Sequence, residues 1–358
     1  MRAAPRGTRG AAVPLPHVAE VSLQPVPVGP YPRDRRHTAG MDLISLADIR
    51  AAADRVRGHV VRTPLLSCPW SETPLWLKPE NLQPVGAFKI RGVVNALAHL
   101  DAAAREAGVV THSSGNHGQA LAYAARARGL HCVVVVPEGA SRVKVAAMRR
   151  FGAEIVTVPP AERQATTRKL LEERGLTLVP PFDAPEIIAG QGTVGEEICQ
   201  DLAEPGTVLV PVGGGGLASG VATAVRQLSP GTRVLGVEPE LAGDAAESLR
   251  VGQLVTWSPE WTRRTIADGT RVGLSELTFA HLRARLDGIV TVTENEIRSA
   301  MGTIARESRI VAEPSGAVAL AAVMAGRVPA KGPTVAVVSG GNVEPSLLSE
   351  VVASERRG

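Results

Sequence analysis

The chain has 358 residues, of which 44% are hydrophobic and 21% charged, which is typical of a globular protein with two or three domain-sized units or of one large two-lobed enzyme. Aromatic residues make up only 3%, which disfavours a surface that stacks nucleobases. The formal net charge of +4 is carried by residues 1–40, where six arginines are opposed only by Glu20 and Asp34. The rest of the chain is electrically balanced, so no nucleic-acid partner is expected.

The three cysteines, Cys68, Cys132 and Cys199, are far apart and lack the spacing of a zinc site. An odd number of scattered cysteines predicts no disulfide framework and favours a reducing compartment. No stretch approaches 18 uninterrupted apolar residues, and the start lacks the pattern of a signal peptide. We therefore expect a cytoplasmic protein without a membrane partner.

Residues 1–40 contain seven prolines and show neither a helical nor a strand period. Such a segment cannot bury enough apolar surface to offset its ordering entropy, so we expect a disordered N-terminal extension. A transit peptide is the alternative. After Met41 apolar residues recur with helical spacing to position 56, and Ser45 is a candidate N-cap. We hypothesise that Met41 is the true start or that the segment before it is dispensable.

From residue 108 the chain alternates short β-branched runs with helical patterns. The patterns predict strands over 108–112, 132–136, 155–158, 207–212, 233–237 and 334–338, and helices over 116–128, 141–151, 161–174 and 217–228. Nearly continuous apolar strands separated by helices indicate an α/β fold with parallel sheets covered on both faces. Ligands of open α/β sheets bind beyond the carboxyl ends of the strands, which directs attention to the residues after each strand.

Three predicted strands end in small polar or glycine-rich turns. One runs into Ser113-Ser114-Gly115-Asn116-His117-Gly118, one into Gly213-Gly214-Gly215-Gly216, and one into Ser339-Gly340-Gly341-Asn342. Four glycines at a helix start expose backbone N–H groups, which predicts a phosphate cradle. The glycines match neither a Walker loop nor a dinucleotide fingerprint, so a single phosphate fits better. A flexible turn without a ligand is the alternative.

Lys89 lies between Phe88 and Ile90, after a turn-prone Pro84-Val85-Gly86. A lysine held between apolar groups has a lowered pKa and can attack carbonyl carbons. Taken alone, the same pattern also suits a surface lysine. Together with a monophosphate site, however, a nucleophilic lysine is what pyridoxal phosphate requires.

These motifs resemble one known family. The block from Pro79-Glu80-Asn81 to Gly86-Ala87-Phe88-Lys89-Ile90-Arg91-Gly92 and the three turns follow in order over residues 45–350. Together they resemble the fold-type II pyridoxal-phosphate enzymes, and within them threonine/serine ammonia-lyases and serine racemase. The resemblance implies two-lobed open parallel sheets with flanking helices, like the tryptophan synthase β chain. A large cofactor-binding domain would comprise 41–107 and 186–358, and a small domain would comprise 108–185.

The resemblance also implies roles for individual residues. Lys89 would carry the cofactor as an imine and then act as the general base at Cα. Asn116 would bond the ring hydroxyl, Ser339 would face the pyridine nitrogen, and the phosphate would lie on the glycine loop formed by Gly213, Gly214, Gly215 and Gly216. The substrate carboxylate would be received at a helix N-terminus by Ser113, Asn116 and His117. A structural histidine at a helix end is the alternative for His117.

Ser114 is the discriminating position. In serine racemase the matching serine supplies a proton on the face opposite the lysine, so Ser114 would be a second catalytic residue. Inversion at Cα needs bases on both faces, whereas elimination does not. The alternative is a serine that merely bonds the backbone of a tight turn.

The resemblance implies a divalent cation site as well. The carboxylates of Glu238 and Asp244 and the carbonyl of Ala242 would bind Mg²⁺ or Ca²⁺, which prefer oxygen ligands. Asp268 lies in another matched loop, and its role is open. Ala87 departs from the family's usual serine, which removes one hydroxyl near the cofactor phosphate. We also expect no regulatory domain, because little sequence follows the Ser339 turn.

The resulting functional prediction is β-elimination of water from L-threonine or L-serine, giving a 2-oxo acid and ammonia. Serine racemase, or a bifunctional racemase and dehydratase, is the first alternative, and threo-3-hydroxyaspartate ammonia-lyase is the second. A catalytically silent protein that binds a phosphate metabolite is the alternative from another class. The implied assembly is a homodimer or homotetramer.

Overall fold

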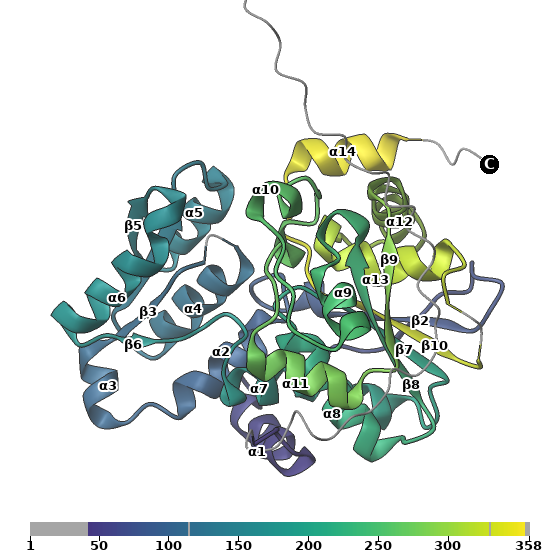
Figure 1. The fold of residues 1–358 in the computed structure, drawn as a ribbon, viewed down its shortest axis with the longest axis horizontal. Coiled ribbons are helices and arrows are strands. Elements are labelled where there is room, and N and C mark those ends of the chain that lie inside the picture. Colours follow the sequence, from purple (N-terminus) through teal and green to yellow (C-terminus); the bar gives the residue numbers. More distant parts are fainter. Residues whose placement is uncertain (1–41, 114, 329–330, 355–358) are drawn as a thin grey trace, which may run out of the picture.

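The computed structural model describes residues 42–113, 115–328 and 331–354, and within them two separate β-sheets (Figure 1). The larger sheet has the strand order β1-β2-β10-β7-β8-β9. Its strands are β1 (Leu66–Ser67), β2 (Leu75–Pro79), β10 (Thr334–Val338), β7 (Thr207–Pro211), β8 (Arg233–Pro239) and β9 (Gly288–Val292). The prediction of an α/β fold with parallel sheets is confirmed, with one difference: β1 pairs antiparallel with β2. β1 is joined to β2 by a short turn, which suits antiparallel pairing and needs no crossover helix.

The smaller sheet is parallel and has the order β5-β4-β3-β6, with β5 (Glu154–Val158), β4 (Cys132–Pro137), β3 (Val109–Thr111) and β6 (Thr177–Leu178). We call this sheet with α4 (Asn116–Ala127), α5 (Arg142–Arg150) and α6 (Arg163–Arg174) the small lobe, and the larger sheet with its helices the large lobe. The small lobe lies at the left of Figure 1. Domain boundaries at residues 108 and 185 stay a prediction.

The predicted strands and helices are present within one or two residues of their expected ends. Ser45 caps α1 (Leu46–Val56) in a reciprocal capping box, because Asp48 N donates to Ser45 Oγ while Ser45 N donates to Asp48 Oδ2. Gly175 ends α6 in the left-handed conformation, as expected of a C-cap glycine. The predicted disordered extension over 1–40 lies outside the described residues.

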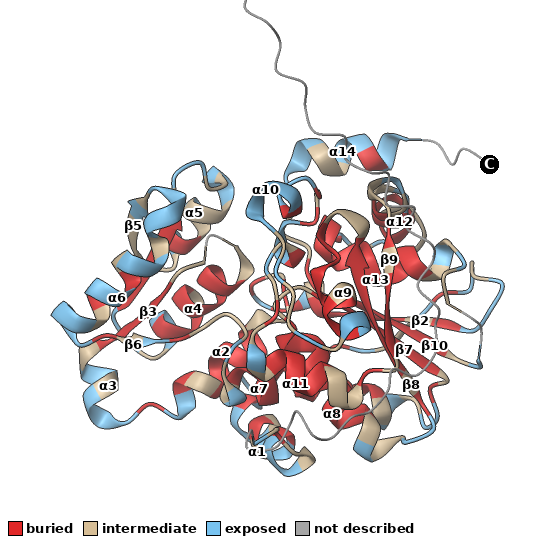
Figure 2. Ribbon diagram, in the orientation of Figure 1, coloured by how far each residue is buried: buried red, intermediate tan, exposed pale blue. Residues whose placement is uncertain are grey.

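Several elements were not predicted. They include α2 (Lys89–Ala98), α3 (Ala102–Ala107), α7 (Pro185–Asp201), α9 (Asp244–Val251), α10 (Pro259–Thr262), α11 (Glu276–Arg285), α12 (Glu294–Glu307), α13 (Pro314–Met324) and α14 (Pro345–Ala353). Helix α13 is apolar on all sides because it is buried against the large sheet, so it lacks the polar face by which a surface helix is recognised (Figure 2).

Helix α7 contains Gly190, Gly192 and Gly195, which lower its intrinsic helix propensity. These glycines allow α2, α7 and α8 (Gly216–Leu228) to pack backbone against backbone. A Cβ at Gly190 would lie 2.6 Å from the Cα of Gly92, and a Cβ at Gly220 would lie 2.4 Å from the carbonyl oxygen of Ile188. Close packing therefore compensates for the low helix propensity of these glycines, and it fixes α2 against the centre of the large lobe.

This packing predicts that Gly220→Ala destabilises the protein. Alanine in an open helix position would stabilise by up to about 1 kcal/mol, but here its Cβ collides with backbone that cannot rotate away. We expect a net loss of about 1–3 kcal/mol in the free energy of unfolding, measured by urea denaturation. Gly231→Ala is the matched control, since a Cβ there meets nothing within 4 Å. Equal effects of the two substitutions would contradict the packing account.

Candidate active site

The segment before Lys89 is joined to the turn that follows β10. Phe88 N donates to Ser339 O at 3.1 Å, and Gly341 N donates to Gly86 O at 2.8 Å. Lys89 is the first residue of α2, so these bonds fix its backbone beside the carboxyl end of β10. Two of the four motifs are thus in direct contact.

Lys89 has no anionic partner in the described part of the chain. Its Nζ donates to the carbonyl oxygen of Pro181 at 2.6 Å and lies 5.0 Å from the centre of the Phe88 ring. Burial lowers the pKa of Lys89 to about 8. At neutral pH a larger fraction of this amine is therefore uncharged than in an ordinary lysine, and the uncharged amine is the nucleophile.

The turn after β3 meets the turn after β10. Asn342 Nδ2 donates to Asn116 Oδ1 at 2.9 Å, and Asn116 Nδ2 donates to Glu313 Oε1 at 2.5 Å. Ser113 Oγ accepts from Gly115 N at 3.3 Å in the turn that leads into α4. The first N–H groups of α4 lack intrahelical partners, as at any helix start, and suit an anion. Ser114 lies outside the described residues.

His117 is buried in the first turn of α4, and its Nε2 lies 2.9 Å from the carbonyl oxygen of Val179. Burial, followed by the charge of Lys89, lowers the pKa of His117 to about 3, so the ring is neutral. Because a carbonyl oxygen accepts, Nε2 carries the proton and Nδ1 is an acceptor without a partner among the described residues. A neutral ring with an unprotonated Nδ1 does not attract a carboxylate. If His117 binds the substrate carboxylate, it does so through its backbone N–H.

The glycine loop lies beside the segment that accepts the Lys89 hydrogen bond. Gly215 has φ +84° and caps α8, and a Cβ at Gly214 would lie 2.3 Å from the ring of Phe182, the residue after Pro181. A Cβ at Gly213 would lie 2.9 Å from Gly269 O. Only glycine fits this enclosed turn, and the N-terminus of α8 adds a favourable field for a phosphate.

Ser339 is buried, and its Oγ donates to the carbonyl oxygen of Ser315 at 3.3 Å. The hydroxyl carries no charge, unlike a carboxylate at the same position. Lys89, Asn116, the glycine loop and Ser339 together provide a reactive amine, a side-chain amide, an anion cradle and a neutral hydroxyl. These groups fit pyridoxal phosphate.

Glu238, Ala242 and Asp244 form a separate group where β8 leads into α9. Glu238 accepts hydrogen bonds from the backbone N–H groups of Ala245 (3.2 Å) and Ala246 (2.7 Å). Burial, with the charge of Asp244 adding to it, raises the pKa of Glu238 well above its usual value, and burial raises the pKa of Asp244. The described residues contain no group of three or more His, Cys, Asp or Glu side chains placed to hold a metal ion. Two buried carboxylates and a carbonyl are nevertheless a donor set that suits Mg²⁺ or Ca²⁺.

Sequence reasoning missed a buried ionic cluster behind Lys89, which we call the Arg91 network: Lys78, Glu80, Arg91 and Glu197. Arg91 Nε and Nη2 donate to the two oxygens of Glu80 at 2.7 and 2.8 Å. Arg91 Nη1 and Nη2 donate to the two oxygens of Glu197 at 2.7 and 2.9 Å. Lys78 Nζ donates to Glu197 Oε2 at 2.6 Å. The same sequence block that contains Lys89 also contains Lys78, Glu80 and Arg91. These charged residues close to Lys89 were the sequence feature from which an ionic cluster could have been predicted.

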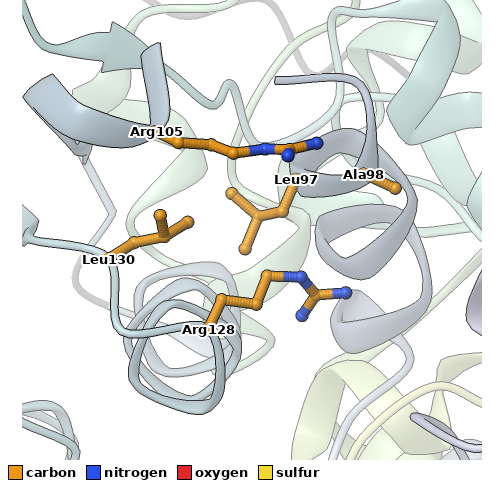
Figure 3. A pocket seen from close by; sticks show the side chains of 5 residues that line it. All are labelled: Leu97, Ala98, Arg105, Arg128 and Leu130. Carbon is orange, nitrogen blue, oxygen red and sulfur yellow. The ribbon is translucent and has the colours of Figure 1, made fainter. Parts of the chain in front are cut away.

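A surface cavity of about 280 Å³ lies at the other end of α2, roughly 12 Å along the helix from Lys89. It is lined by Leu97, Ala98, Arg105, Arg128 and Leu130, and the two arginine side chains lie on either side of Leu97 (Figure 3). Arg105 lies in the last turn of α3, and Arg128 is the C-cap residue of α4. The dipole of a helix stabilises a cation at its C-terminus, as at both of these positions. The cavity is therefore separate from the candidate active site.

Comparison with known proteins identifies the family of this chain. Residues 56–340 match the family model described as pyridoxal-phosphate dependent enzyme, and the chain belongs to that family. It is 37% identical over 319 residues to L-threo-3-hydroxyaspartate ammonia-lyase of Saccharomyces cerevisiae, covering 87% of this chain and 97% of that protein. It is 38% identical to serine racemase of Dictyostelium discoideum, covering 87% and 99%.

A solved structure of the threonine deaminase of T.th. has a TM-score of 0.79 at 43% identity, covering 84% of this chain and 99% of that chain. The predicted family and fold are thereby confirmed. The three relatives carry different activities at similar identity, so the comparisons do not select one of them. Among the described residues no helix is both long and apolar enough to cross a bilayer.

The Arg91 network predicts a large effect of Arg91→Met. The substitution leaves Glu80 buried without its cation and removes two bonds from Glu197. Breaking a buried ion pair from one side costs about 3–5 kcal/mol, so we expect a loss of that size in the free energy of unfolding, measured by denaturant titration. Arg57→Met, which removes an exposed pair with Asp54, is the control and should leave stability near wild type. A tolerated Arg91→Met would show that the network does not anchor α2.

Proposed function

We propose that the protein is a pyridoxal-phosphate-dependent ammonia-lyase that eliminates water from L-threonine or L-serine, giving a 2-oxo acid and ammonia. The observation that carries the proposal is the convergence of four separated motifs on Lys89, an enclosed lysine with a lowered pKa and no ion-pair partner in the described residues. The family assignment supports the cofactor.

Each group has a part in this proposal. The N-terminus of α8 would hold the cofactor phosphate, Asn116 would donate to the ring hydroxyl, and Ser339 would face the ring nitrogen. The N-terminus of α4 and Ser113 receive the substrate carboxylate. Bound pyridoxal phosphate would supply an electron sink for the bond broken at Cα. Lys89 would take the Cα proton and return it to the Cβ hydroxyl, which leaves as water. Hydrolysis of the released enamine then gives the 2-oxo acid and ammonia.

Ser339 supports elimination over chemistry that needs a long-lived carbanion. Its hydroxyl is neutral, whereas a carboxylate at that position would stabilise a positively charged ring nitrogen and strengthen the electron sink. With a neutral hydroxyl at this position, bound pyridoxal phosphate would accept electrons from Cα less strongly. This favours reactions in which the leaving group departs promptly from Cβ.

Serine racemase is the second candidate. It is supported by Ser114, which stands where that enzyme has its second base, and by the similarity to the racemase of Dictyostelium discoideum. Elimination from threo-3-hydroxyaspartate is the third, supported by the similarity to the yeast ammonia-lyase.

One assay separates these activities. Purified protein loaded with pyridoxal phosphate is incubated separately with L-serine, L-threonine and L-threo-3-hydroxyaspartate, and 2-oxo acid, ammonia and D-serine are quantified. We expect 2-oxo acid from serine or threonine in large excess over D-serine, and a loss of at least about a thousandfold in Lys89→Ala because nucleophile and base are removed together. Turnover that survives Lys89→Ala would contradict the proposal.

Ser114→Ala refines the outcome. If the protein is a lyase, this variant should retain oxo-acid formation within a few-fold of wild type, because elimination does not need a base on the second face. Dominant formation of D-serine that Ser114→Ala abolishes, with elimination retained, would replace the lyase by the racemase.

We also propose that Glu238, Asp244 and the Ala242 carbonyl hold Mg²⁺ or Ca²⁺ as a structural ion that fixes the turn between β8 and α9. The cation would relieve the repulsion between two buried carboxylates. Because both pKa values are raised, protons compete with the cation at low pH.

The cation proposal predicts that MgCl₂ or CaCl₂ raises the thermal midpoint of EDTA-treated protein by several degrees at pH 8, and less at pH 5.5. Sodium chloride at equal ionic strength should not do so. In Glu238→Gln the increment should disappear. A divalent effect that persists in Glu238→Gln would place the ion elsewhere.

A further inference from the structure

Glu313 is a buried carboxyl group that the proposed mechanism does not use. It precedes α13, and its backbone N–H donates to Gly340 O at 3.0 Å. Its side chain is only 2% exposed, and a Cβ on Gly340 would lie 2.1 Å from Glu313 Oε1. Glu313 is therefore held tightly against the turn that carries Ser339, and glycine at position 340 is what leaves room for it.

Glu313 and Asn342 together determine how the Asn116 amide is oriented. Asn342 Nδ2 donates to both Val85 O and Asn116 Oδ1, each at 2.9 Å, which uses both of its hydrogens. The oxygen of Asn116 must then face Asn342, and its nitrogen faces Glu313 Oε1. One N–H of Asn116 remains free to point at a ligand. This orientation requires that Glu313 accept a hydrogen bond.

The charge that faces Glu313 comes from the other lobe. Lys144 on α5 places its Nζ 3.9 Å from Glu313 Oε2 and 2.7 Å from Asp268 Oδ2, and the Lys144 side chain is only 11% exposed. Glu313 Oε2 has no hydrogen-bond partner among the described residues. Lys144 is thus the cation nearest to this carboxyl, and it reaches Glu313 only while α5 is docked against the large lobe.

We propose that Glu313 is a positioning residue that orients the Asn116 amide toward the cofactor, and that Lys144 keeps Glu313 an ionised acceptor, so that cofactor contact depends on docking of the small lobe. The proposal rests on the proposed function, because it assumes that Asn116 contacts bound pyridoxal phosphate. Lys144 and Glu313 act through Asn116 and need not touch the substrate.

The charges around Glu313 are consistent with this role. Burial raises the pKa of Glu313 to about 7, the charge of Lys144 opposes the rise, and that of Asp268 adds to it. The groups that face the carboxyl are Lys144 from α5, Asp268 from the turn Asp268–Thr270, and Asn116 from α4. Protonation removes the charge that strengthens the hydrogen bond from Asn116 and turns one carboxyl oxygen into a donor, so the Asn116 amide is held less firmly.

The test follows the visible absorbance of the bound cofactor between pH 6 and 9 and the dissociation constant of pyridoxal phosphate, both measured on holoenzyme. We expect wild type to show a spectral transition near neutral pH that Glu313→Gln lacks. In Glu313→Gln the dissociation constant should rise about tenfold, a loss expected for a hydrogen bond to a charged group. Lys144→Met removes a cation, so it should move the transition to higher pH, whereas Lys144→Arg should leave it in place.

Glu344→Gln is the matched control, because it makes the same chemical change at the same contact between lobes. Glu344 accepts from Ser141 Oγ at 2.6 Å and has no hydrogen bond to Asn116. It should retain the wild-type transition and dissociation constant. An unchanged Glu313→Gln, or equal effects of Glu344→Gln, would overturn the proposal.

Two further controls distinguish misfolding of a variant, and failure of the proposed function, from loss of the positioning role. If Glu313→Gln fails to fold by circular dichroism, the opposite expectations for Lys144→Met and Lys144→Arg decide the question. If wild type shows no visible band that depends on Lys89, the proposed function itself fails. A wild-type band with unchanged variants defeats only the positioning role.

Discussion

The anchoring of α2 by the buried Arg91 network is the constraint on which the candidate site depends. Arg91 is fully buried two residues after Lys89, and its guanidinium bonds two carboxylates from different parts of the large lobe. Such a cluster is stable only when its charges balance, as they do here with two cations and two anions. Helix α2 is fixed further by glycine-mediated packing against α7, the helix that also carries Glu197. The first residue of α2, Lys89, is consequently held in place without an ion pair of its own.

The contrast between Lys78 and Lys89 shows what this arrangement achieves. Both lysines come from the same stretch of sequence; Lys78 is fully buried and Lys89 is half-buried. Burial lowers the pKa of both lysines, but at Lys78 the charges of Glu197 and Glu80 oppose the fall. Lys89 meets only a carbonyl oxygen and an aromatic ring. The difference in partners, more than the burial itself, leaves Lys89 available as a nucleophile.

The family and the α/β fold predicted from the sequence are confirmed, whereas the roles of the site residues stay predictions. Three of the four site motifs directly follow a predicted, largely apolar strand, so strand and turn could be identified locally. The Lys89 motif follows β2, which was not predicted. Helix α7 could not be recognised because its glycines argue against a helix until their packing partners in α2 and α8 are known. The ionic partners of Arg91 and the contacts of Glu313 were also inaccessible, since Glu197 and Lys144 are remote in sequence and reach these residues only through the tertiary fold. Ser114 was identified from sequence alone and lies outside the described residues.

The most direct test of the account is to identify the lysine that carries the cofactor. Pyridoxal phosphate is added to the purified protein, borohydride reduction fixes it to the amine that holds it, and peptide mass spectrometry locates the modification. The account predicts modification of Lys89 in near-stoichiometric amount, with Lys78, Lys144, Lys169 and Lys331 unmodified. Modification of Lys78, or a distribution over several lysines, would contradict the claim that the fold presents Lys89 as the one reactive amine.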